Sequence, residues 1–153
     1  MIKLIIYKVL EDDEMEYKVF GETIVLRLEK GEEVIESIKT LCEKEDIGLG
    51  SISGLGATNH VTVGLFKVSE KKYYSNTFEE DFEITNLTGN ISRMNGEVYL
   101  HIHGTFADID GKCIGGHLNK AIISATSEII INRINGEMGR QFSEEIGLNL
   151  IKF

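Results

Sequence analysis

The sequence has 153 residues, of which 42% are hydrophobic and 27% charged, and its formal net charge is −9. A chain of this size and composition buries enough apolar surface for one globular unit, so we expect a single domain over residues 1–153. Its acidity argues against direct nucleic-acid binding, which needs a basic face to release counterions from phosphates.

The N-terminal segment, MIKLIIYKVL at 1–10, has an apolar run that Lys3 and Lys8 interrupt. The run is too short for a membrane span and has no small-residue cleavage site, so we expect a first strand there and no membrane anchor. The two cysteines, Cys42 and Cys113, have no CxxC partner, which disfavours a disulfide framework and indicates the reducing cytoplasm. We expect both to be buried, inert thiols.

One helix is predicted over about residues 32–45. Gly31 precedes it, and Glu32 and Glu33 place negative charge in the first turn, where the helix dipole favours it. Apolar side chains then recur at helical spacing along one face. They are Val34, Ile35, Ile38, Leu41 and Cys42.

Almost all of the remaining chain has the pattern of β-strands. Asn95-Gly96 is the strongest hairpin signal, because both residues tolerate the positive φ of a type I′ turn, and Asn135-Gly136 is a second such pair. The basic cluster of Lys67, Lys71 and Lys72 is diluted by Glu70 and is expected to be a solvated loop. The fold class predicted is α+β, a mainly antiparallel β-sheet with one principal covering helix. Strands are predicted at 23–28, 49–53, 61–68, 82–92, 97–107, 112–118 and 121–131.

Three of the four histidines fall in one predicted hairpin. Alternation along strand 97–107 places His101 and His103 on the same face. The loop 109–111 fits a three-residue turn closed by glycine, which sets His103 opposite His117, whereas a tighter two-residue turn would shift the pairing by one. Three imidazoles with one open position are typical of catalytic zinc, so the sequence predicts a site for zinc or another divalent transition metal.

Other residues near this hairpin leave alternatives open. Gly104, Gly115 and Gly116 remove side-chain bulk, which permits either close approach of a backbone or ligand, or a bulge in the strand. Glu128, an acid flanked by isoleucines, is a candidate fourth ligand, partner of a ligand or general base, and equally a solvent-facing acid. His60 has no matching partner and is expected to be an ordinary surface histidine.

Five stretches carry a family resemblance: IVLRLEKGEEVIESI at 24–38, GSISGLGATNHVTVGLF at 50–66, LTGNIS at 87–92, HIHGTFADIDGKCIGGHL at 101–118 and ATSEIII at 125–131. With them the chain resembles the plants and prokaryotes conserved (PPC) domain, a domain of unknown function, over about residues 20–150. HxH followed by GGHL is the most specific part of the match. The resemblance implies an α+β fold around an antiparallel sheet, assembly as a homotrimer, and zinc bound through His101, His103 and His117.

The functions described for members of this family differ. Plant members join this domain to AT-hooks that hold the DNA minor groove, and prokaryotic members carry the label of predicted DNA-binding proteins. This sequence has no Arg-Gly-Arg-Pro core and no proline. We therefore expect a metal-binding homotrimeric module that carries the DNA-binding label by resemblance. The alternative is a metal-dependent small-molecule enzyme, decarboxylase- or hydrolase-like, because acetolactate decarboxylase has a similar architecture and a three-histidine metal. The sequence identifies no catalytic residue or substrate.

Overall fold

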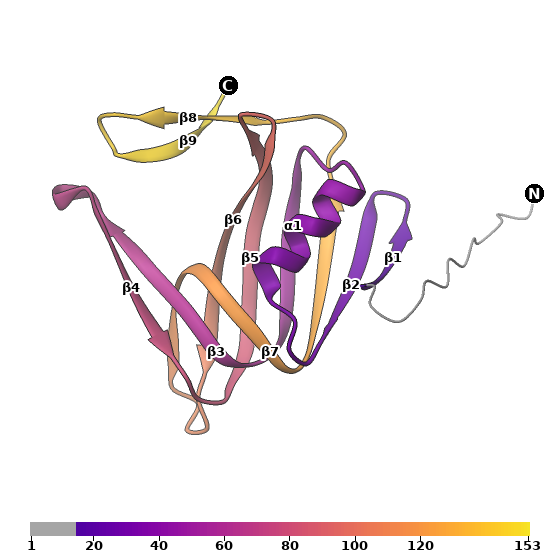
Figure 1. The fold of residues 1–153 in the computed structure, drawn as a ribbon, viewed down its shortest axis with the longest axis vertical. Coiled ribbons are helices and arrows are strands. Elements are labelled where there is room, and N and C mark those ends of the chain that lie inside the picture. The colour runs from indigo at the N-terminus through magenta and orange to yellow at the C-terminus, as the bar shows by residue number, and fades with distance from the viewer. Residues whose placement is uncertain (1–14) are drawn as a thin grey trace, which may run out of the picture.

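The computed structural model describes residues 15–153, which form a mainly antiparallel β-sheet covered by one α-helix (Figure 1). The predicted α+β class is therefore confirmed, while the strand predicted at 1–10 lies outside the described residues. No helix within residues 15–153 is long and apolar enough to cross a membrane. The elements are β1 (Glu16–Phe20), β2 (Thr23–Glu29), α1 (Val34–Lys44), β3 (Gly50–Lys67), a 3-10 turn (Val68–Glu70), β4 (Lys72–Phe78), β5 (Phe82–Met94), β6 (Glu97–Ala107), β7 (Cys113–Arg133), β8 (Gly139–Ser143) and β9 (Leu148–Lys152).

Helix α1 packs on the sheet through the apolar face that the periodicity predicts. Ile38 and Leu41 are fully buried there, and the helix contacts β6 and β7. The helix begins slightly later than expected, because Glu33 is its N-cap: the Glu33 carboxylate accepts hydrogen bonds from the backbone N–H of Glu36 at 2.8 Å and of Ala121 at 2.9 Å. This side chain therefore fixes the start of the helix to strand β7.

Strands β3 and β7 are the longest in the sheet, and each was predicted as two separate strands. They pair antiparallel over most of their length, with register shifts between Gly56 and Thr58, between Thr58 and His60, and between Thr62 and Val63. Bulges rather than turns therefore interrupt the alternation, and a pattern of apolar residues alone does not distinguish the two. The early part of β7 pairs with β6 and the later part with β2, so one strand connects two regions of the sheet.

The strand order is β1-β2-β7-β3-β5-β8-β9, with β4 added to β3, and with β6 between β5 and β7. The core lies between α1 and the face of the sheet that it covers (Figure 1). Alternate residues of the central strands point into it, which sends their neighbours to the opposite, outer face. The largest fully buried side chains include Ile24, Leu26, Leu28, Ile84, Leu87, Ile91, Ile102, Phe106 and Ile123.

The two Asn-Gly pairs behave differently. Asn95 and Gly96 both have positive φ, 53° and 82°, and close the β5–β6 hairpin as predicted. Asn135-Gly136 was wrongly expected to close a hairpin: β8, which follows it, pairs with β5 and β9 instead of returning along β7. Only Gly136 of this pair has positive φ, so the backbone lacks the conformation of a type I′ turn. The β8–β9 hairpin extends away from the body of the sheet (Figure 1).

Candidate metal centre

His101 and His103 project from the outer face of β6, as the alternation predicts. Ile102 between them is 1% exposed and belongs to the core, whereas His101 is half-buried and His103 exposed. Two imidazoles on one face of a strand lie about 7 Å apart at their backbones, a separation that their side chains can close.

The β6–β7 turn brings in the third histidine. The backbone N–H of Asp108 donates to the Lys112 carbonyl at 2.9 Å, and Gly111, with φ of 75°, donates to the Asp108 carbonyl at 2.9 Å. This is the predicted three-residue turn, and its register pairs His103 directly with His117. The tighter alternative turn, which would have moved His117 to the other face, is not formed.

The three imidazoles converge. The candidate ligand atoms of His101, His103 and His117 all lie within 4.8 Å of one another, and the Nε2 atoms of His101 and His103 are 3.2 Å apart. Two nitrogen ligands of one tetrahedral zinc, each bonded at about 2.0–2.1 Å, are separated by about 3.3 Å. The observed spacing therefore fits ligands that share one ion. Within residues 15–153, no other group of histidine, cysteine or acidic side chains meets the same criterion.

The surroundings of the cluster keep two of its imidazoles neutral. Burial is the main cause that lowers the pKa of His101, followed by the nearby His117, His103 and Arg140. Burial, and then His103, lowers the pKa of His117. Because a metal binds the neutral imidazole, these shifts hold both side chains in the ligand form near neutral pH.

Glycines allow the strands to approach closely around the cluster. A Cβ on Gly116, whose φ is +155°, would lie 2.7 Å from the carbonyl oxygen of Gly64 on β3. A Cβ on Gly115 would lie 2.6 Å from the carbonyl oxygen of Gly104, and one on Gly104 would lie 2.6 Å from the Phe106 ring. The contacts at Gly116 and Gly115 support the first of the two predicted roles, because a side chain at either position would force β7 away from β3 or from β6 beside the histidines.

Two side chains that the sequence did not single out flank the cluster. Tyr73 on β4 packs its ring edge-on to His117, with 6.0 Å between centroids, and donates from its hydroxyl to Asn119 Oδ1 at 2.5 Å. Arg140 on β8 lies near enough to His101 to lower the pKa of that histidine. Both strands are distant from the hairpin in sequence, so only strand pairing brings these residues to the site.

Glu128 and His60, the other two side chains considered from the sequence, lie outside the histidine cluster. Glu128 is exposed on β7, where it pairs with Arg27 of β2 and Leu55 of β3, and it is not part of the three-histidine group. Its role as a ligand or base is therefore not supported, because eleven positions along an extended strand separate it from His117 by about 35 Å of chain. His60 is also outside the group, and its Nδ1 lies 3.2 Å from Glu79 Oε1.

The cysteines do not form part of the site either. Burial raises the pKa of Cys42 to about 12, so this thiol is inert, as predicted. Cys113 is exposed, contrary to the prediction, because it begins β7 directly after the β6–β7 turn, where no element covers it.

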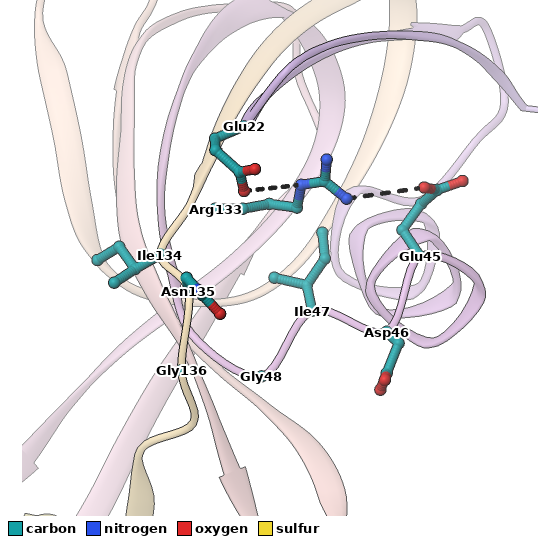
Figure 2. A pocket seen from close by; sticks show the side chains of 9 residues that line it. All are labelled: Glu22, Glu45, Asp46, Ile47, Gly48, Arg133, Ile134, Asn135 and Gly136. Atoms are coloured by element: carbon teal, nitrogen blue, oxygen red, sulfur yellow. Dashed lines mark ion pairs between the residues drawn. The ribbon is translucent and has the colours of Figure 1, made fainter.

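A polar hollow of about 380 Å³ lies at the C-terminal end of α1 and contains none of the histidines (Figure 2). Arg133 extends between Glu22 and Glu45, with its Nε 3.7 Å from Glu22 Oε2 and its Nη1 4.0 Å from Glu45 Oε2. Its Nη2 also donates to the Gly21 carbonyl at 2.6 Å. Arg133 thus pairs with two of the three carboxylates that line this hollow, and we assign no chemistry to it.

Comparison with known proteins identifies relatives over nearly the whole chain. The model of the Plants and Prokaryotes Conserved domain, abbreviated PCC or PPC, matches residues 15–135. A crystal structure of a candidate DNA-binding protein from Bacteroides thetaiotaomicron is 34% identical, with a TM-score of 0.89 over 91% of this chain and 97% of that one. No curated protein matches the sequence.

Further solved structures share the fold. A metal-containing protein from Archaeoglobus fulgidus is 29% identical, with a TM-score of 0.79 over 91% of this chain and 98% of that one. A plant- and prokaryote-conserved protein from Pyrococcus horikoshii is 26% identical, with a TM-score of 0.79 over 94% and 98%. Acetolactate decarboxylase from Bacillus subtilis is 13% identical, with a TM-score of 0.53 over 76% and 54%, which shows a likeness of fold alone.

Proposed function

The chain belongs to the Plants and Prokaryotes Conserved domain family, and on this basis we propose that it is a metal-binding member of the family. The ion is zinc or another divalent transition metal, held by His101, His103 and His117. The observation that carries this proposal is the convergence of three imidazoles, with 3.2 Å between the Nε2 atoms of His101 and His103. The metal-containing relative from Archaeoglobus fulgidus supports it.

The donor set favours a transition metal over calcium or magnesium. Imidazole nitrogen suits zinc and its neighbours, whereas hard cations prefer oxygen, and no carboxylate within residues 15–153 joins the three histidines. Three protein ligands leave one coordination position open in a tetrahedral site. A metal bound in this way supplies Lewis acidity and lowers the pKa of a bound water.

The residues of the chain define the rest of the site. His101 and His117 are held neutral by burial, Tyr73 packs against the edge of the His117 ring, and Arg140 supplies positive charge beside His101. Metal analysis of protein purified without added zinc tests the proposal. We expect about one equivalent of a transition metal per chain, and its loss when His101 and His103 are both replaced by alanine.

We also propose that the protein assembles as a homotrimer in the cytoplasm. Apolar side chains exposed on the outer face of the sheet support self-association: Val25 is 39%, Ile130 43% and Leu55 54% exposed. Val25 and Ile130 are cross-strand partners, so they form a continuous patch that other copies of the chain would cover. The exposed thiol of Cys113 suits a reducing compartment.

Two other functions come into question, DNA binding and metal-dependent catalysis, and the observations favour only the second. The DNA-binding descriptions belong to relatives, and the net charge of −9 opposes attraction to phosphate, so we propose that the metal module has no direct affinity for duplex DNA. A metal-dependent small-molecule enzyme is favoured by one observation, the presence of Tyr73 and Arg140 beside a site with an open coordination position.

A further inference from the structure

Arg140 is held rigidly at the edge of the histidine cluster. Its Nε donates to Ser92 Oγ at 2.7 Å, its Nη1 to the Asn149 carbonyl at 2.9 Å, and its Nη2 to Asn90 Oδ1 at 2.9 Å. The guanidinium carbon also lies 4.5 Å from the centroid of the Tyr99 ring. Contacts from three directions leave this side chain little rotational freedom.

Strand pairing places this guanidinium beside His101. Asn90 lies directly opposite His101 in the β5–β6 ladder, and Ser92 lies opposite Tyr99, so all four side chains share the outer face. Tyr99 also precedes His101 by two residues on that face, about 7 Å along the strand. Arg140 therefore contacts both the cross-strand partner and the same-face neighbour of a proposed metal ligand.

The charge of Arg140 has no acidic partner within residues 15–153. Each of the other three arginines pairs with a carboxylate, Arg27 with Glu16, Arg93 with Asp46 and Arg133 with Glu22. The three groups that accept from Arg140 are a hydroxyl, an amide oxygen and a backbone carbonyl, all neutral. A guanidinium has five N–H donors, so one N–H on each terminal nitrogen remains for a further acceptor.

We propose that the site binds a small organic anion whose carboxylate contacts both the open coordination position of the metal and Arg140. The inference rests on the proposed metal site, where a divalent ion and three neutral imidazoles add two positive charges to the one of Arg140. Carboxylate oxygen is a ligand for zinc, and a carboxylate also matches the planar donors of a guanidinium. The two oxygens of one carboxylate can therefore contact the metal and Arg140, one oxygen each.

The test uses the full chain loaded with cobalt(II), whose visible spectrum reports changes in its ligands. Acetate is titrated at constant ionic strength, with acetamide as the neutral control, and binding is followed by absorbance and calorimetry. We expect Arg140→Gln to raise the acetate dissociation constant by about tenfold or more, as expected for loss of a charged hydrogen bond. Arg140→Lys should restore part of the affinity, and Arg27→Gln, at a distant arginine, should leave it unchanged.

A second variant guards against loss of the β8–β9 hairpin. Asn90→Asp keeps Arg140 in place but gives it a carboxylate partner, and it should weaken acetate binding to a similar extent. Cobalt content and the unfolding midpoint are measured for every variant before titration.

Folded, cobalt-loaded Arg140→Gln and Asn90→Asp proteins with wild-type acetate affinity would show that Arg140 only anchors the hairpin. Phosphate binding as tight as that of acetate, with the same dependence on Arg140, would overturn the assignment to carboxylates. Failure of the wild type to bind cobalt would instead reject the metal site itself.

Discussion

His103 on β6 lies directly opposite His117 on β7, and this cross-strand pair converts an HxH motif into a three-nitrogen cluster. A register slip of one residue would turn His117 toward the core face. The pairing depends on the turn at 108–112, where Gly111 has a φ of 75°. The metal site that we propose therefore depends on turn geometry as much as on histidine content.

The first prediction concerns metal content. Replacing His101, His103 or His117 individually by alanine should lower the zinc content strongly, because each removes one of only three protein ligands. His60→Ala is the matched control and should keep wild-type zinc, since His60 faces Glu79 instead. Elemental analysis of each purified protein measures this. Equal zinc in the wild type and in the His101→Ala, His103→Ala double variant would reject the cluster as the site.

The second prediction concerns the pH dependence of the metal-free protein. The pKa values of His101 and His117 are lowered in the folded chain, chiefly by burial, relative to about 6.5 when unfolded. Below about 6.5 the unfolded chain thus binds more protons than the folded one, so the free energy of unfolding should fall as the pH falls through this range. Urea denaturation between pH 5 and 8 measures it, and the His101→Gln, His117→Gln double variant should show a shallower dependence.

A third prediction tests the close approach of β3 and β7. Gly116→Ala should destabilise the fold by about 1–3 kcal/mol, because it places a side chain in a backbone conformation that favours glycine. It should also lower zinc affinity, since the added Cβ would lie 2.7 Å from the Gly64 carbonyl oxygen, opposite His117. Gly139→Ala meets no atom within 4 Å and serves as the control. Unchanged stability and zinc affinity in Gly116→Ala would contradict the predicted constraint.

The fourth prediction is that the isolated protein does not bind duplex DNA at physiological salt. A net charge of −9 gives repulsion from phosphate, and the lysine cluster at the β3–β4 turn includes an ion pair between Lys67 and Glu70. Fluorescence anisotropy with a labelled duplex, repeated at several salt concentrations, measures the affinity. A salt-sensitive dissociation constant below micromolar would show that assembly creates a basic face.

The fifth prediction is a trimeric mass in solution. The exposed apolar pair of Val25 and Ile130 needs covering, and the family resemblance implies three copies. Light scattering at micromolar concentration measures the mass. A monomeric mass under these conditions would refute the prediction.

Local sequence signals determined much of the site. The period of 3.6 residues predicted α1, and the alternation in 97–107 predicted the common face of His101 and His103. The glycine at 111 indicated a tight turn but left two registers open, and the structure has the one that pairs His103 with His117. Each of these signals acts over a few residues, through backbone conformation and side-chain direction. They required no knowledge of the rest of the fold.

Tertiary structure decided what surrounds the histidines. Bulges joined predicted strand pairs into β3 and β7, β4 brought Tyr73 to His117, and β8 carried Arg140 across to β5 instead of returning along β7. The same pairing placed Glu128 far from the cluster. Strand partners depend on long-range burial and hydrogen bonding between segments distant in sequence, and the side chains of exposed edge strands carry little of that information.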